Sequence, residues 1–69
     1  MLNVSGRQAL ILAEALGFTI GVLARFPADS RPERNIEDMR SLLDEIEPDA
    51  RSMAEADVAR WLAAFRTAR

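Results

Sequence analysis

The chain has 69 residues, 49% of them hydrophobic, and its eleven acidic and nine basic residues leave a net charge of −2. It contains no His, Cys, Tyr or Lys, so imidazole, thiol, phenol and amine groups for catalysis, Cys–His zinc sites and disulfides are all excluded. We therefore predict one non-enzymatic domain over residues 1–69, with no cofactor and no metal.

The small size of the chain favours self-association. A chain of this length buries only about 60% of the surface that its unfolded form exposes, and no disulfide reinforces the core. The low net charge provides no strong field for nucleic acid, so we do not expect nucleic acid as a partner. Arg in place of every Lys is typical of a GC-rich bacterial or phage gene, and we expect a cytoplasmic location.

The first predicted helix begins at Gly6 and continues to the residues before Pro27. Ser5 and Gln8 have the spacing of a capping box, which predicts a hydrogen bond from the Gln8 amide to the Ser5 hydroxyl. The apolar run over 9–24 is about 24 Å long as a helix, shorter than the roughly 30 Å core of a bilayer. It also lacks the pattern of a signal peptide, so we expect no membrane contact. An alternative interpretation ends the helix at Gly17 and makes 18–23 a strand.

Nearly the whole circumference of this helix is apolar, apart from a narrow stripe that contains Arg7, Glu14 and Arg25. A broad apolar side lies on one flank of the stripe. A second apolar side carries Ile11, Ala15, Phe18 and Val22. A helix of this kind is normally buried all round, and two further short helices cannot cover it. We therefore predict a homodimer in which the second side pairs with the same side of another copy.

Gly17 and Gly21 form a G-x-x-x-G pattern inside this helix. Each Gly costs about 1 kcal/mol relative to Ala in a helix interior, which favours either a close helix–helix crossing or, for Gly17, a cap or kink. We assign the surface of small residues around the two glycines to the dimer interface. Its residues are Leu10, Ala13, Gly17, Ile20, Gly21 and Ala24.

The segment 26–32 contains two prolines and three polar residues and is predicted to be a loop. Arg and aromatic side chains are enriched at interaction hot spots, so we predict a partner-binding patch around this loop. Its residues are Arg25, Phe26, Arg31 and Arg34. The alternative is that neighbouring acids such as Glu33 neutralise these arginines locally.

The second helix is predicted to begin after Asn35, a good N-cap, and to end near Glu47, before Pro48. Its apolar residues recur every three or four positions, as in a one-sided amphipathic helix. An acidic cluster surrounds its end and comprises Asp44, Glu45, Glu47 and Asp49. This spacing matches no calcium loop, so we interpret the cluster as a solvated helix end.

The third helix is predicted to begin either at Pro48, as its first residue, or at the capping-box pattern of Ser52 and Glu55. Trp61 lies on its apolar side, so we expect it in the core; an exposed Trp61 would instead be a candidate anchor for a partner. Glu55 and Asp57 would repel DNA phosphates if this were a recognition helix.

Together these features predict an all-α fold, a small three-helix bundle with a long N-terminal helix followed by a helical pair, dimeric through the first helix. For function we expect a small non-enzymatic module that binds and modulates another protein, as bacterial regulators and phage-encoded inhibitors do. One alternative is a small DNA-binding transcriptional regulator or antitoxin-like protein that uses the loop arginines, whose affinity would fall steeply with salt. A structural subunit of a larger assembly is a third alternative.

Overall fold

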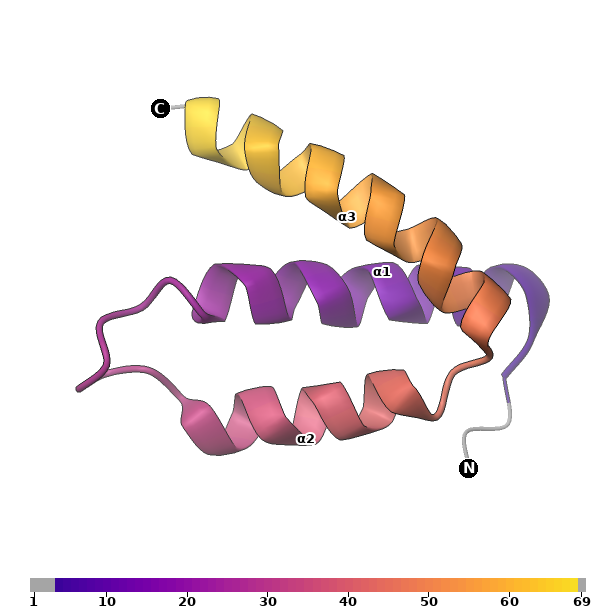
Figure 1. Ribbon diagram of the computed structural model, residues 1–69, viewed down its shortest axis with the longest axis horizontal. Helices are drawn as coiled ribbons and strands as arrows, with labels where there is room; N and C mark the ends of the chain where they lie inside the picture. The colour runs from indigo at the N-terminus through magenta and orange to yellow at the C-terminus, as the bar shows by residue number, and fades with distance from the viewer. Residues whose placement is uncertain (1–3, 69) are drawn as a thin grey trace.

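The computed structural model describes residues 4–68 and contains three helices (Figure 1). They are α1 (Gly6–Leu23), α2 (Glu33–Asp44) and α3 (Pro48–Thr67). Residues 4–68 include no strand, so the predicted all-α arrangement of three helices is confirmed. The alternative with a strand over 18–23 is wrong, because α1 continues without a break through Gly17.

The N-terminus of α1 differs from the predicted capping box in its hydrogen bonding. Ser5 does occupy the N-cap position with an extended backbone, but its side chain makes no capping hydrogen bond. Gly6 adopts a φ of +57°, a left-handed conformation that a residue with a Cβ rarely takes. The chain therefore turns into α1 at Gly6, and the first backbone hydrogen bond of the helix is donated by the Ala9 amide to the Ser5 carbonyl.

The second helix begins earlier than Asn35. Pro32 occupies the N-cap position and its carbonyl accepts a hydrogen bond from the Ile36 amide at 3.0 Å, so Asn35 lies within the first turn of α2. The N-cap prediction for Asn35 is wrong because the chain already turns into helix directly after Pro32. Of the two starts predicted for the third helix, the structure uses Pro48 as the first helical residue.

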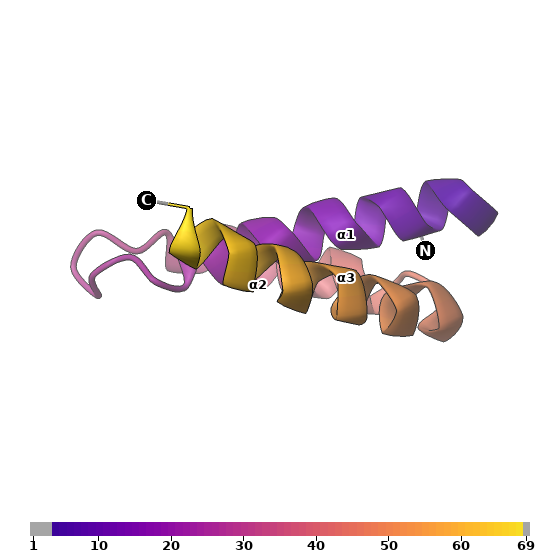
Figure 2. The same ribbon diagram turned by 90° about the horizontal axis from the view of Figure 1, so that it is seen from above.

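The helices form two thin layers rather than a closed bundle. α1 packs against both α2 and α3, whereas α2 and α3 diverge from the turn that joins them (Figure 1). Seen from above, α1 lies in one layer, with α2 and α3 in the other (Figure 2). The molecule measures 34 × 26 × 13 Å along its principal axes, so it is flat, and residues 4–68 form no third layer of helices.

The core between the layers is built from small side chains. Among the described residues, seven apolar side chains are buried, and four of them are alanines. They are Ala9, Ala13, Ile36, Ile46, Ala50, Ala54 and Val58. Leucines from α1 and α2 pack against the edge of this cluster and are only partly buried. Small side chains let the helices approach closely, but they remove little apolar surface from water.

The G-x-x-x-G pattern mediates the crossing of α1 and α3 within one chain. A Cβ atom added at Gly17 would lie 3.3 Å from Val58 Cγ2, and one added at Gly21 would lie 2.5 Å from Leu62 Cδ1. The interpretation of the pattern as a close helix–helix contact is therefore correct. Ala13 is also buried in this intramolecular contact, at 1% exposure.

This placement changes where a dimer interface can lie. Ala13, Gly17 and Gly21 face the chain's own α3, so they do not offer a free surface to a second copy. Leu10 and Ile20 are partly buried, and Ala24 is exposed just beyond the C-terminal end of α1. Three of the six predicted residues therefore belong to the inner side of α1, and the side of α1 that remains open is the opposite one.

Candidate interaction surfaces

A patch of large apolar side chains lies open along α1 and the second half of α3. We call it the aromatic face, and its residues are Ile11, Ala15, Phe18, Trp61, Ala64 and Phe65. The exposed fraction is 51% for Ile11, 40% for Trp61 and 53% for Phe65. Scattered exposed apolar residues are ordinary, but large ones that adjoin each other normally mark an interaction site.

The aromatic face arises from the two apolar sides of α1 and from the course of α3. The broad side of α1 contacts α2 and α3, which leaves Ile11, Ala15 and Phe18 of its second side outside the core. Because α3 diverges from α2, its later turns are not covered by a third helix. The expectation that Trp61 is a core residue is therefore wrong, and its exposure makes it a candidate anchor.

Two phenylalanines brace the aromatic face. The rings of Phe18 and Phe65 meet edge to face, with centroids 5.9 Å apart and an interplanar angle of 83°. This is a preferred arrangement of aromatic pairs, and it favours one relative orientation of the two rings within the single chain. A surface ordered in advance loses less entropy when it binds.

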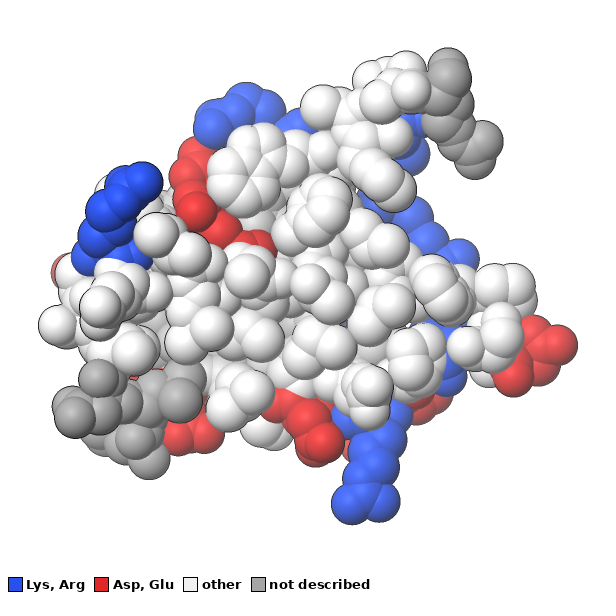
Figure 3. Space-filling model, turned by 180° about the vertical axis from the view of Figure 1, so that it is seen from behind, with Lys and Arg blue, Asp and Glu red and all other residues white. Residues whose placement is uncertain are grey.

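Charged groups surround this surface rather than cross it. The space-filling view from the α1 side shows a broad uncharged area with acidic and basic groups at its margins (Figure 3). Glu14 borders the aromatic face directly. An apolar centre with a charged rim is the usual anatomy of a protein–protein interface.

Glu14 on α1 and Asp57 on α3 form a carboxyl pair at this margin. Their mutual hydrogen bond, with smaller contributions from desolvation and the charge of Asp57, raises the pKa of Glu14. The same hydrogen bond, together with one from Arg60 Nη2 to Asp57 Oδ1 at 2.7 Å, lowers the pKa of Asp57. Of the two carboxyl groups, Glu14 therefore loses its proton at the higher pH.

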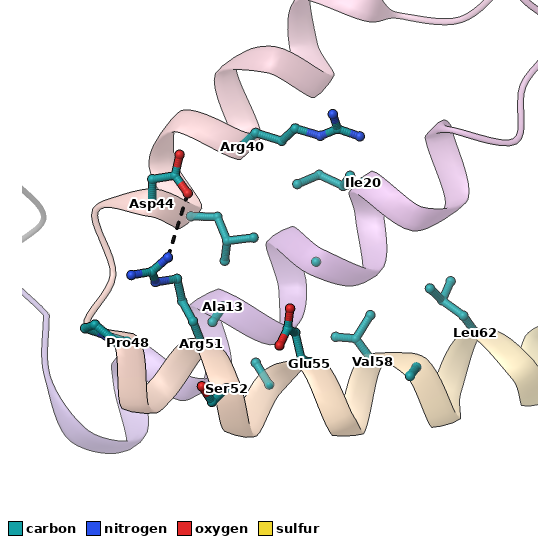
Figure 4. A pocket seen from close by; sticks show the side chains of 14 residues that line it. Ala13, Ile20, Arg40, Asp44, Pro48, Arg51, Ser52, Glu55, Val58 and Leu62 are labelled. Atoms are coloured by element: carbon teal, nitrogen blue, oxygen red, sulfur yellow. Dashed lines mark ion pairs between the residues drawn. The ribbon is translucent and has the colours of Figure 1, made fainter.

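A groove opens between α2 and α3 on the other side of α1 (Figure 4). Ala13, Gly17 and Ile20 of α1 line it, and Val58 and Leu62 of α3 form much of one wall. Its volume is about 540 Å³. Because opposite sides of α1 contribute to the groove and to the aromatic face, the two surfaces lie on opposite sides of the molecule.

The rim of this α2–α3 groove carries charges of both signs. Arg40 and Asp44 come from α2, and Arg51 and Glu55 come from α3. Arg51 and Asp44 form an ion pair of 3.8 Å across the closed end of the groove, where Arg51 Nε also donates to the Ile46 carbonyl at 2.9 Å. These contacts hold the α2–α3 turn and leave the open end lined mainly by apolar side chains.

The loop arginines do not form one free patch. Arg31 donates from Nε and Nη2 to the Phe26 carbonyl at 3.1 and 2.9 Å, and its Nη1 pairs with Glu33 at 3.2 Å. The alternative of local neutralisation therefore describes Arg31. Arg25 and Arg34 are exposed, with Arg25 directed back to the Gly21 carbonyl, and Phe26 is 41% exposed beside the C-terminal half of α3.

No metal site is formed by the residues that the structure describes. Within residues 4–68, no three acidic side chains come together as a set of ligands. In the acidic cluster, the side chain of Asp44 is 80% exposed and pairs with Arg51. This arrangement fits the interpretation of the cluster as a solvated helix end.

The periodicity of α1 located half of the aromatic face but missed the half on α3. The exposure of Trp61 and Phe65 depends on the angle between two helices, for which the sequence has no local signal.

α1 is also long and apolar enough, by length and composition alone, to cross a membrane, and the chain buries only 17% of it. Comparisons with protein families, with curated proteins and with solved structures found no match.

Proposed function

We propose that the protein is a small non-enzymatic interaction module that binds another protein and modulates its activity or assembly. The observation that carries this proposal is the pair of apolar surfaces on opposite sides of α1, neither of which is covered by residues 4–68. The side-chain chemistry supports it as well, because the chain has no His, Cys, Tyr or Lys for catalysis.

The aromatic face has the composition of a binding hot spot. Trp and other aromatic side chains dominate the energy of many interfaces, where they lie in a central area surrounded by polar groups. Trp61 and Phe65 hold this central position, with Glu14, Asp57 and Arg60 at the margin. The residues that support binding at this face therefore come from α1 and α3 and not from the loop arginines.

The α2–α3 groove supports the binding of a helical segment. Its walls are two helices that already diverge, so a third helix can lie between them without displacing a core residue. An amphipathic helix would place its apolar side on Ile20, Val58 and Leu62. Arg40 and Glu55 stand on opposite rims, so the favoured segment carries both an acidic and a basic residue beside its apolar side.

Photo-crosslinking tests the proposal at both surfaces. A photo-reactive amino acid replaces Ala59 in the groove, Phe65 in the aromatic face or Met53 as the control, in cells that express the protein. Met53 is on α3, is 61% exposed and lines neither surface. We expect adducts with a polypeptide other than this chain from position 59 or 65 and none from position 53. Adducts from neither surface, or equal adducts from position 53, would contradict the proposal.

A further inference from the structure

We infer that the aromatic face is occupied by a second copy of this chain, which gives a two-fold symmetric dimer and leaves the α2–α3 groove free for the target. This inference rests on the proposed function, because it assigns one of the two proposed surfaces to a defined occupant. The interface consists of the second apolar side of α1 together with Trp61 and Phe65 of α3.

The first argument is the surface area of the single chain. Its accessible surface is 5056 Å², whereas size scaling gives about 4300 Å² for a compact monomer of 7.7 kDa. The surplus of about 700 Å² is close to the roughly 800 Å² that each partner contributes to a standard interface. The radius of gyration, 12.5 Å, likewise exceeds the value of about 11 Å expected for this length. The surplus accessible surface of one chain is therefore about the area that a single second copy would cover.

The second argument is the shape of the aromatic face. A two-fold interface must be complementary to itself, because every contact between two residues occurs twice. The face offers both halves of such a contact, since exposed Ile11 of α1 and exposed Trp61 and Phe65 of α3 line the same shallow valley. In the pair, Ile11 of each copy enters the valley of the other. The buried core of the interface then contains only aliphatic and aromatic side chains.

The third argument is the charge at the margin of the aromatic face, which also favours a second copy of the chain over a membrane as the occupant. The margin carries acidic groups, Glu14 and Asp57, and basic groups, Arg7 and Arg60, close to one another. A two-fold axis can bring opposite charges of the two copies together. A surface that lies on an anionic bilayer is instead bordered mainly by basic side chains, and the chain as a whole is acidic.

Light scattering coupled to gel filtration, over a wide range of concentration, tests the inference directly. We expect the wild-type chain at twice its 7.7 kDa mass, and Ile11→Glu and Phe65→Glu at the mass of one chain. Met53→Glu introduces the same charge at a comparably exposed position outside the aromatic face and should remain dimeric. Trp61 is the only tryptophan and the chain has no tyrosine, so its fluorescence should shift to the red in the two monomeric variants.

The controls separate loss of the interface from loss of the fold. Helix content by circular dichroism should be unchanged in the monomeric variants; if Ile11→Glu unfolds, Ala15→Arg on the same exposed side replaces it in the test. A monomeric wild type at every concentration, a dimeric Ile11→Glu that is folded, or a monomer that binds vesicles of anionic lipid would overturn the inference. Crosslinks from position 65 to a different polypeptide, with a monomeric wild type, would overturn it while leaving the proposed function intact.

Discussion

The carboxyl pair of Glu14 and Asp57 makes the stability of the fold depend on pH. The pKa of Glu14 is raised above its ordinary value of 4.5. The folded chain therefore keeps this proton to a higher pH than the unfolded chain, and the stabilisation is lost as the pH rises through the folded pKa. The pKa of Asp57 is lowered from 3.8, so its stabilisation is lost as the pH falls through its folded value.

Glu14→Gln should remove the loss of stability that occurs when Glu14 ionises as the pH rises. A Gln amide can donate to the Asp57 carboxylate as a protonated Glu14 does, but it does not ionise. We expect the variant to have a higher melting temperature than the wild type at neutral pH, and the difference to shrink as the pH approaches 4.5. Thermal unfolding followed by circular dichroism across this range measures the effect. Glu37→Gln, at an exposed position on α2, is the control; parallel pH profiles for all three proteins would contradict the prediction.

At the scale of helices, the glycines of α1 set how closely α3 can approach. Gly17→Leu places a side chain where Val58 now lies, because even a Cβ atom would be 3.3 Å from Val58 Cγ2. Val58 is buried and β-branched, so it has little freedom to move aside. We expect a loss of about 1–3 kcal/mol in the free energy of unfolding, measured by chemical denaturation. Thr19→Leu, at an exposed position of the same helix, should change stability far less.

The helices themselves could largely be predicted from the sequence, because local signals define them. The apolar positions of α1 and the proline at the start of α3 each predict an element that the structure contains. The errors lie at the ends of elements. Ser5 takes its expected position without its expected hydrogen bond, and α2 begins after Pro32 instead of Asn35. At such ends, several turn conformations are close in energy.

The candidate site was less predictable, because it depends on how helices are placed relative to one another. The periodicity of α3 puts Trp61 on the same side as Val58, yet Val58 is buried and Trp61 is 40% exposed. The difference arises because Val58 packs over Gly17 where α1 and α3 cross, whereas Trp61 lies on the side of α3 that lines the open aromatic face. The sequence also does not show that Arg31 is unavailable as part of a partner-binding patch. Its guanidinium donates two hydrogen bonds to the Phe26 carbonyl of its own loop.

For the whole molecule, a dimer through the aromatic face predicts a stability that depends on concentration. The seven side chains that are buried within residues 4–68 are mostly small, so burial of the aromatic face would contribute a large part of the apolar surface that folding removes from water. We expect the melting temperature of the wild type to rise over about a hundredfold increase in protein concentration, because the folded chain binds its copy. Differential scanning calorimetry measures this rise. Ile11→Glu should melt at one temperature throughout, and an invariant wild type would contradict the prediction.

The position of the groove relative to α1 has a consequence for the assembled pair. Two chains joined at the aromatic face would direct their α2–α3 grooves away from each other, since groove and face lie on opposite sides of α1. The pair would therefore be bivalent and would bridge two target molecules instead of holding one more tightly. If the target is itself a dimer or a filament, the second groove would bind its target molecule at an effective concentration set by the fixed spacing of the two grooves. The strength of binding would then be the avidity of the pair and not the affinity of a single groove.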